Sequence, residues 1–144
     1  MSKLLEISNE ELELVIQNTS DKLNMSKAIV EKDLWVCVIL QYLFSSFKYR
    51  NAIVFKGGTS LSKVYKLIER FSEDIDIALD CKVLGYEKTE PYKDRSNTKQ
   101  QEFNDKLNYD TKVFLHDEFL PILQNDFQEI LKNKAYRFYI DEND

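Results

Sequence analysis

The 144-residue chain contains few residues that interrupt regular structure, with only three glycines and two prolines. Its two cysteines, Cys37 and Cys81, have neither metal-ligand spacing nor a secretory context, so we expect reduced thiols rather than a disulfide framework. The longest apolar run, Leu34 to Leu40, is far too short to span a membrane, and the first residues lack the apolar core of a signal peptide. These absences argue against the membrane-spanning and disulfide-rich secreted classes and predict a cytoplasmic protein.

The residues that are present favour one packed domain. Hydrophobic residues make up 43% of the chain and aromatic residues 12%, which is typical of a globular protein rather than a disordered one. The length suits a single domain with a core large enough to fold alone. The net charge of −5 is not that of a general nucleic-acid binder, although one stretch is locally basic. That stretch, residues 56–70, carries Lys56, Lys63, Lys66 and Arg70 against one acid, Glu69.

The stretch from Ala52 to Asp80 organises the rest of the sequence. Residues 52–55 are apolar and partly β-branched, which favours a buried strand, and Gly57 and Gly58 end it in an open turn that a ligand can approach. Helical periodicity follows, with one apolar face formed by Leu61, Val64, Tyr65 and Ile68. Thr59 or Ser60 can cap this helix, whose unpaired N–H groups and positive dipole end suit a phosphate.

Two aspartates follow on the next predicted strand. Polar and apolar residues alternate from Asp74 to Leu79, so Asp74 and Asp76 share one face. Their Cα atoms would lie roughly 6–7 Å apart, close enough for both carboxylates to bind one cation. A divalent metal would neutralise their repulsion, and hard oxygen ligands suit Mg²⁺ or Mn²⁺, with further ligands from substrate phosphates.

Each feature alone has a less specific interpretation. An exposed Asp-x-Asp pair is most often a solvated strand face, and Gly-Gly is most often an ordinary tight turn. Lys63 and Lys66 fit a solvated helix face equally well, whereas Arg70, just before the carboxylate strand, could pair with a carboxylate or grip a phosphate. The order of glycine turn, basic helix and carboxylate strand favours the functional interpretation.

This order resembles nucleotidyltransferases of the DNA polymerase β superfamily, in which a strand, a Gly-Gly or Gly-Ser turn and a helix precede Asp-x-Asp. A closer resemblance is to the AbiEii/AbiGii toxin family of abortive-infection systems. It covers about residues 26–80 and rests on Glu31-Lys32-Asp33-Leu34-Trp35, on Lys56-Gly57-Gly58-Thr59-Ser60-Leu61, and on Arg70-Phe71-Ser72-Glu73-Asp74-Ile75-Asp76.

The resemblance implies Mg²⁺-dependent transfer of a nucleotide from an NTP to an RNA, such as tRNA, or to a protein acceptor. It also implies a toxin–antitoxin or abortive-infection system with a cognate antitoxin. Asp74 and Asp76 would be the catalytic metal ligands. The nucleotide would be bound by Lys56, Gly57, Gly58, Thr59, Ser60, Arg70 and Ser72. Two alternatives stay open: an inactive or incomplete nucleotide-binding or partner-binding module of the same fold, and a purely structural acidic domain.

The whole chain predicts an α+β domain with a small mixed sheet flanked by helices. The expected organisation is a single domain, 1–144, with helical support at 1–48, the strand–turn–helix–strand core at 52–80, a polar loop at 81–101, and helices with a final strand at 102–144. Capping residues Ser8 and Ser26 mark the first two helices. The loop could form a lid or be disordered. Pro121 is expected in the first turn of a new helix, and Tyr136–Ile140 as a strand added to the sheet.

The resemblance also predicts missing parts. Nucleotidyltransferases of this superfamily usually have a third carboxylate on a later strand, and AbiEii/AbiGii proteins are generally longer. Asp141 is a formal candidate for the third acid, although a terminal surface aspartate is the more ordinary interpretation. We therefore expect a truncated domain or fragment that binds NTP–Mg²⁺ weakly and transfers nucleotides slowly or not at all.

Overall fold

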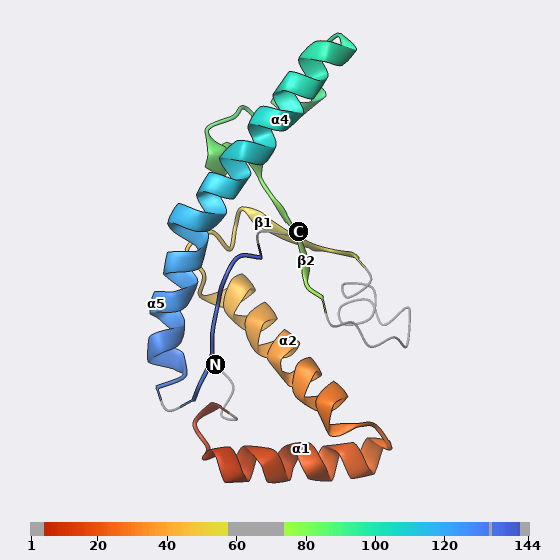
Figure 1. Ribbon diagram of the computed structural model, residues 1–144, viewed down its shortest axis with the longest axis vertical. Helices are drawn as coiled ribbons and strands as arrows, with labels where there is room; N and C mark the ends of the chain where they lie inside the picture. The colour runs from red at the N-terminus through yellow and green to blue at the C-terminus, as the bar shows by residue number, and fades with distance from the viewer. Residues whose placement is uncertain (1–4, 58–73, 133, 142–144) are drawn as a thin grey trace. The chain divides into compact units, whose positions relative to one another are not determined.

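The computed structural model describes residues 5–57, 74–132 and 134–141, and the chain divides into two compact units, Met1–Leu79 and Asp80–Asp144 (Figure 1). The first unit contains α1 (Asn9–Leu23), α2 (Lys27–Ser45), β1 (Ile53–Lys56) and β2 (Asp76–Leu79). The second contains 3₁₀ turns at Cys81–Leu84 and Glu90–Tyr92, then α4 (Asn97–Phe114), a π-helical turn (Leu115–Phe119) and α5 (Leu120–Ile130). The described residues thus form helices and a two-stranded antiparallel sheet, which confirms the predicted α+β class.

Both predicted N-terminal caps are present. The Ser8 hydroxyl accepts a hydrogen bond from the Glu11 N–H at 3.1 Å, and the Glu11 carboxylate accepts one from the Ser8 N–H at 3.0 Å, which completes a capping box. The Ser26 hydroxyl caps α2 by accepting a hydrogen bond from the Ile29 N–H at 3.3 Å. α1 ends at Leu23, and its C-cap Asn24 adopts the left-handed conformation with φ 53°.

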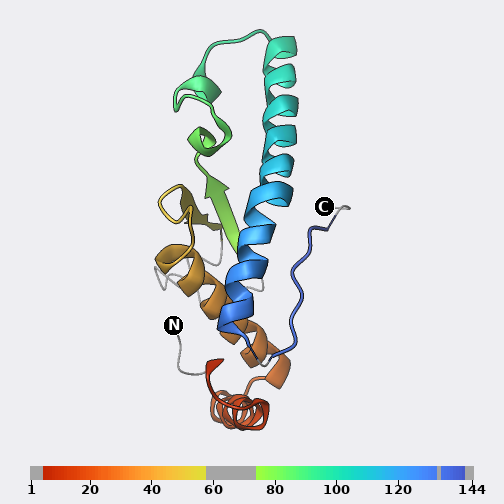
Figure 2. The same ribbon diagram turned by 90° about the vertical axis from the view of Figure 1, so that its left-hand side faces the viewer.

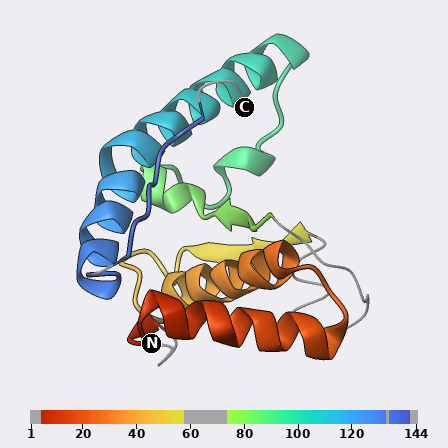
Figure 3. The same cartoon turned by 60° about the horizontal axis from the view of Figure 1, so that its bottom comes forward.

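The core of the first unit lies along α2. α1 packs beside α2, and β1 runs along another side of the same helix (Figure 3). Phe47 is fully buried just after α2, with its ring centroid 5.8 Å from that of Tyr42 and 5.7 Å from that of Tyr49. Phe44 meets Phe55 of β1 at 6.2 Å. This ring contact joins α2 to the sheet.

The strand register places apolar residues on one sheet face and polar residues on the other. Ile53 pairs with Leu79 and Phe55 with Ile77, and these two pairs form the face toward α2. The opposite face carries the remaining pairs, Val54 with Ala78 and Lys56 with Asp76. β2 thus places one of the two predicted site carboxylates on the face turned away from α2.

In the second unit, α4, the π-helical turn and α5 follow one another as a single long rod (Figure 2). Pro121 lies in the first turn of α5, as predicted. Proline has no N–H and its ring collides with the carbonyl four residues back, so a regular α-helix cannot pass through it undisturbed. The wider π-helical turn at Leu115–Phe119, directly before it, is the local adjustment.

The prediction of a final strand was wrong within the described residues. Tyr136–Ile140 takes part in no strand pairing there, and the only described strand partners are β1 and β2. The aromatic rings of this segment instead pack on α5. The ring centroids of Tyr136 and Phe138 lie 6.4 and 5.0 Å from that of the fully buried Phe127. The Gln124 side-chain amide of α5 donates to the Phe138 carbonyl at 3.3 Å. Aromatic packing on a helix therefore replaces the expected sheet pairing.

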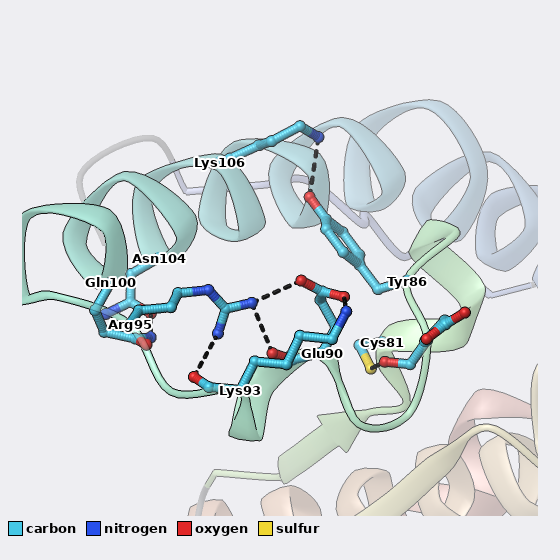
Figure 4. A network of polar contacts seen from close by, with 9 residues as sticks. Cys81, Tyr86, Glu90, Lys93, Arg95, Gln100, Asn104 and Lys106 are labelled. Atoms are coloured by element: carbon cyan, nitrogen blue, oxygen red, sulfur yellow. Dashed lines mark hydrogen bonds and ion pairs between the residues drawn. The ribbon is translucent and has the colours of Figure 1, made fainter.

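The prediction of one long loop at 81–101 was also wrong. Two 3₁₀ turns occupy part of it, and α4 begins at Asn97 behind a Ser96 cap. Figure 4 shows polar contacts within this segment and the hydrogen bond that joins its Tyr86 to Lys106 of α4. Arg95 donates to the Glu90 carboxylate at 2.6 Å and to the Glu90 carbonyl at 2.8 Å, and its guanidinium lies 4.2 Å from the centre of the Phe103 ring.

A second set of contacts fixes the same segment further along α4. Tyr86 donates a hydrogen bond to Asp110 and accepts one from Lys106 at 2.9 Å, and its ring meets Phe103 edge-on at 5.7 Å. Lys106 also donates to Asp110 at 2.5 Å. The hydrogen bonds from Lys106 and from Tyr86 hold the pKa of Asp110 below its ordinary value. This second set joins residues that are 20 and 24 positions apart in the sequence.

Candidate active site

Gly57 and Asp76 approach each other closely at the end of the strand pair. Gly57 follows β1 directly and has φ +72°, a conformation that favours glycine. A Cβ placed on Gly57 would lie 1.8 Å from Asp76 Oδ2 and 2.7 Å from Asp76 Cγ. The Asp76 carboxylate therefore occupies the space that any other side chain at position 57 would need. A glycine is required here both by the backbone conformation and by the neighbouring carboxylate.

Lys56 brings a positive charge to the same place. It is the register partner of Asp76 across the two strands, and both side chains are exposed. Opposite charges in directly facing positions stabilise a strand pair by roughly 0.2–1 kcal/mol. A lysine beside a carboxylate also gives the site a cation that can contact phosphate oxygens. The sheet end thus combines an oxygen ligand, a basic group and a closely approached backbone.

Asp74 lies two residues before the first residue of β2. The sequence placed both aspartates on one strand, but β2 starts at Asp76, so the predicted strand is two residues too long at its beginning. Asp74 and Asp76 are both exposed. The structure therefore confirms neither a shared strand face nor a measured separation of the two carboxylates, and their joint role stays a prediction.

The remaining predicted nucleotide-binding residues, Gly58, Thr59, Ser60, Arg70 and Ser72, lie outside the described residues, together with the helix predicted between the glycine turn and the carboxylate strand. Of the predicted site, the structure thus describes Lys56, Gly57, Asp74 and Asp76. It brings Lys56 and Gly57 together with Asp76.

The donor set fits a hard divalent cation. Asp74 and Asp76 offer exposed carboxylate oxygens, the ligand type that Mg²⁺ and Mn²⁺ prefer. Within residues 5–57, 74–132 and 134–141, no three histidine, cysteine or acidic side chains gather in a way that could hold a metal ion. Mg²⁺ usually keeps several waters and takes one or two protein carboxylates together with substrate phosphates. Two aspartates are therefore a chemically sufficient protein contribution to such a site.

The second unit holds the chain's single histidine and the candidate third acid. His116 is largely exposed and its Nδ1 lies 2.8 Å from Asp117 Oδ1. Asp141 lies at the end of the segment that packs on α5, and its proposed part as a third acid stays a prediction. Sequence reasoning missed that Asp76 fills the space beside Gly57. In the sequence, the only sign of this contact is a glycine followed by a strand that carries aspartates. That pattern does not say how close the two residues lie.

A family model described as the nucleotidyl transferase AbiEii toxin of type IV toxin–antitoxin systems matches residues 38–142 of the chain. This range is more than half of the 144 residues and contains both β1 and β2. The chain belongs to the AbiEii nucleotidyl transferase toxin family. No curated protein and no solved structure matches it.

AbiEii membership gives the strand pair its functional context, because the matched range contains Lys56, Gly57, Asp74 and Asp76. It also confirms the family named on sequence motifs alone. Among the described helices, none combines the length and the apolar character that crossing a membrane would require.

Proposed function

We propose that this chain is a Mg²⁺-dependent nucleotidyltransferase that transfers a nucleotide from an NTP to an RNA or protein acceptor, as the toxin of a toxin–antitoxin pair. The observation that carries the proposal is the Asp76 carboxylate lying against Gly57, directly across from Lys56. The AbiEii family assignment supports it. We place the reaction in the cytoplasm, and we propose an antitoxin as the partner that restrains it.

Each described residue has a role in this proposal. Asp76, with Asp74, would hold Mg²⁺, which when bound would neutralise phosphate charge. Gly57 leaves room for the Asp76 carboxylate beside the backbone, since a Cβ there would collide with it. Lys56 would contact a phosphate oxygen as a point charge. Catalysis at such a site consists mainly of positioning and electrostatic stabilisation.

The proposal predicts transfer that depends on Mg²⁺ and on Asp76. The purified chain, in excess over acceptor so that slow turnover is visible, is incubated with Mg²⁺, total tRNA and each NTP labelled at the α-phosphate. We expect label in RNA with at least one NTP, and loss of that label in Asp76→Asn or when EDTA replaces Mg²⁺.

Asp80→Asn is the matched control, because it removes the same charge four residues along the chain. Asp80 caps the 3₁₀ turn by accepting from the Lys82 N–H at 3.0 Å, and asparagine caps equally well. Nucleotide transfer by the Asp80→Asn variant should equal that of the wild type. Labelling that persists in Asp76→Asn would refute the assignment of Asp76 as a metal ligand. NTP binding without any transfer would favour the alternative, an incomplete nucleotide-binding module.

A further inference from the structure

The face of the sheet that carries Asp76 also carries an exposed apolar pair. Val54 lies in the middle of β1 and its side chain is 62% exposed, although β-branched apolar residues in strands usually pack against a neighbour. Its register partner is Ala78, which is partly exposed. Their side chains consist of methyl groups and, in valine, one methine, so the exposed surface of this apolar pair carries no polar side-chain atom.

The apolar pair is continuous with the candidate active site. Side chains two residues apart on a strand point to the same face, so Val54 and Lys56 lie together on it, as do Ala78 and Asp76. The two pairs are spaced by roughly 6–7 Å along the strands. One sheet face therefore carries a charged pair beside Gly57 and, one step along, an apolar pair.

A nucleotide has the same division of chemistry. Its triphosphate is anionic and binds cations and backbone N–H groups, whereas the two faces of its base are flat and apolar enough to pack on aliphatic side chains. The sugar separates these parts by a distance comparable to one step along a strand face. The charged pair suits the phosphate end, and the apolar pair suits the base.

We propose that Val54 and Ala78 form the seat for the base of the nucleotide whose phosphates bind at Gly57 and Asp76. This inference rests on the proposed function. Neither side chain carries a hydrogen-bonding group, so the seat contributes affinity without distinguishing one base from another. Selection among NTPs must then come from other residues.

The test compares two ligands that share the phosphates and differ in the base. Dissociation constants for ATP–Mg²⁺ and for tripolyphosphate–Mg²⁺ are measured on the full chain by calorimetry, for the wild type and for Val54→Thr. Threonine keeps the size and β-branching of valine, so the strand is preserved. Replacing a methyl by a hydroxyl in an apolar contact should weaken ATP binding by roughly fourfold, because about 0.8 kcal/mol is lost per buried carbon. Tripolyphosphate binding should not change.

Val113→Thr, the same substitution at a 39% exposed position on α4, is the control and should leave both constants unchanged. If Val54→Thr weakens both ligands equally, or neither, the base seat is wrong. In that case loss of ATP binding in Asp76→Asn would leave the proposed function standing. If the wild type binds neither ligand, the proposed function falls and the base seat with it.

Discussion

Gly57→Ala tests the packing of the candidate site directly. Two effects of this substitution should each lower the free energy of unfolding, and they should add. Alanine at φ +72° is held in the left-handed region, which costs about 1–2 kcal/mol for an L-residue. Its Cβ would also meet Asp76 Oδ2 at 1.8 Å, Cγ at 2.7 Å and Cβ at 3.0 Å, so the Asp76 side chain must leave its position. An off-rotamer displacement of that kind costs about 0.5–1.5 kcal/mol. We expect the free energy of unfolding to fall by about 1.5–3.5 kcal/mol in total.

Gly85→Ala supplies the matched control. Gly85 has φ +84°, and a Cβ there would have nothing within 4 Å. It carries the backbone cost alone, so its free energy of unfolding should fall by about 1–2 kcal/mol. Urea denaturation of both variants gives the difference, which is the contribution of the Asp76 contact.

A double-mutant cycle assigns that difference to Asp76. Asp76→Ala removes the two closest atoms and leaves only the 3.0 Å approach of Cβ. Gly57→Ala should therefore cost about 0.5–1.5 kcal/mol less in the Asp76→Ala background than in the wild type. If Gly57→Ala costs no more than Gly85→Ala, and the cycle shows no coupling, the close approach of Asp76 to Gly57 is refuted.

The remaining predictions concern folding. Phe127→Ala should lower the free energy of unfolding by about 3–5 kcal/mol in urea titrations, because this fully buried ring contacts two others; a loss below 1 kcal/mol would contradict the aromatic packing of the C-terminal segment on α5. Ser8→Ala should cost about 1 kcal/mol by the same assay, and Ser8→Asp, which can still cap, much less. The Lys106 hydrogen bond, and after it that of Tyr86, lower the pKa of Asp110, so this carboxylate contributes stability above its ordinary pKa of 3.8 that is lost as the pH falls below that value. Asp110→Asn should remove this contribution, so the difference in the free energy of unfolding between wild type and variant should shrink as the pH is lowered from neutral through 3.8 and below; a difference that stays constant would refute it.

Local signals in the sequence predicted the local structure well. Ser8 and Ser26 each precede an apolar periodic segment, and both cap a helix because the bond runs between residues three apart. Pro121 was placed correctly for the same reason, since its effect is confined to the neighbouring turn. The α+β class follows from such local patterns together with the strand at residues 53–56.

The errors arise where distant residues decide the structure. Aromatic and β-branched content predicted a strand at Tyr136–Ile140, but a strand needs a partner, and these rings pack on Phe127 instead. The polar composition of residues 81–101 predicted a loop. Its order comes from contacts such as those of Tyr86 with Asp110, 24 residues away, which leave no periodic pattern in the sequence.

The candidate site was predictable in its residue types and not in its geometry. Glycines, a basic residue and paired aspartates in this order named the family. The register that sets Lys56 across from Asp76, and the space shared by Asp76 and Gly57, depend on how two strands meet. Alternation alone made the second strand start too early, at Asp74, because periodicity cannot tell where hydrogen-bonded pairing begins.

The most direct measurement of the central claim is the binding of ATP–Mg²⁺ to the full chain by calorimetry, compared between wild type, the Asp74→Asn/Asp76→Asn double variant and Asp80→Asn. We predict Mg²⁺-dependent binding by the wild type and by Asp80→Asn, and at least a tenfold loss of affinity in the double variant, equal to about 1.4 kcal/mol. Equal affinity in all three proteins would contradict this prediction and would place the nucleotide site elsewhere on the chain.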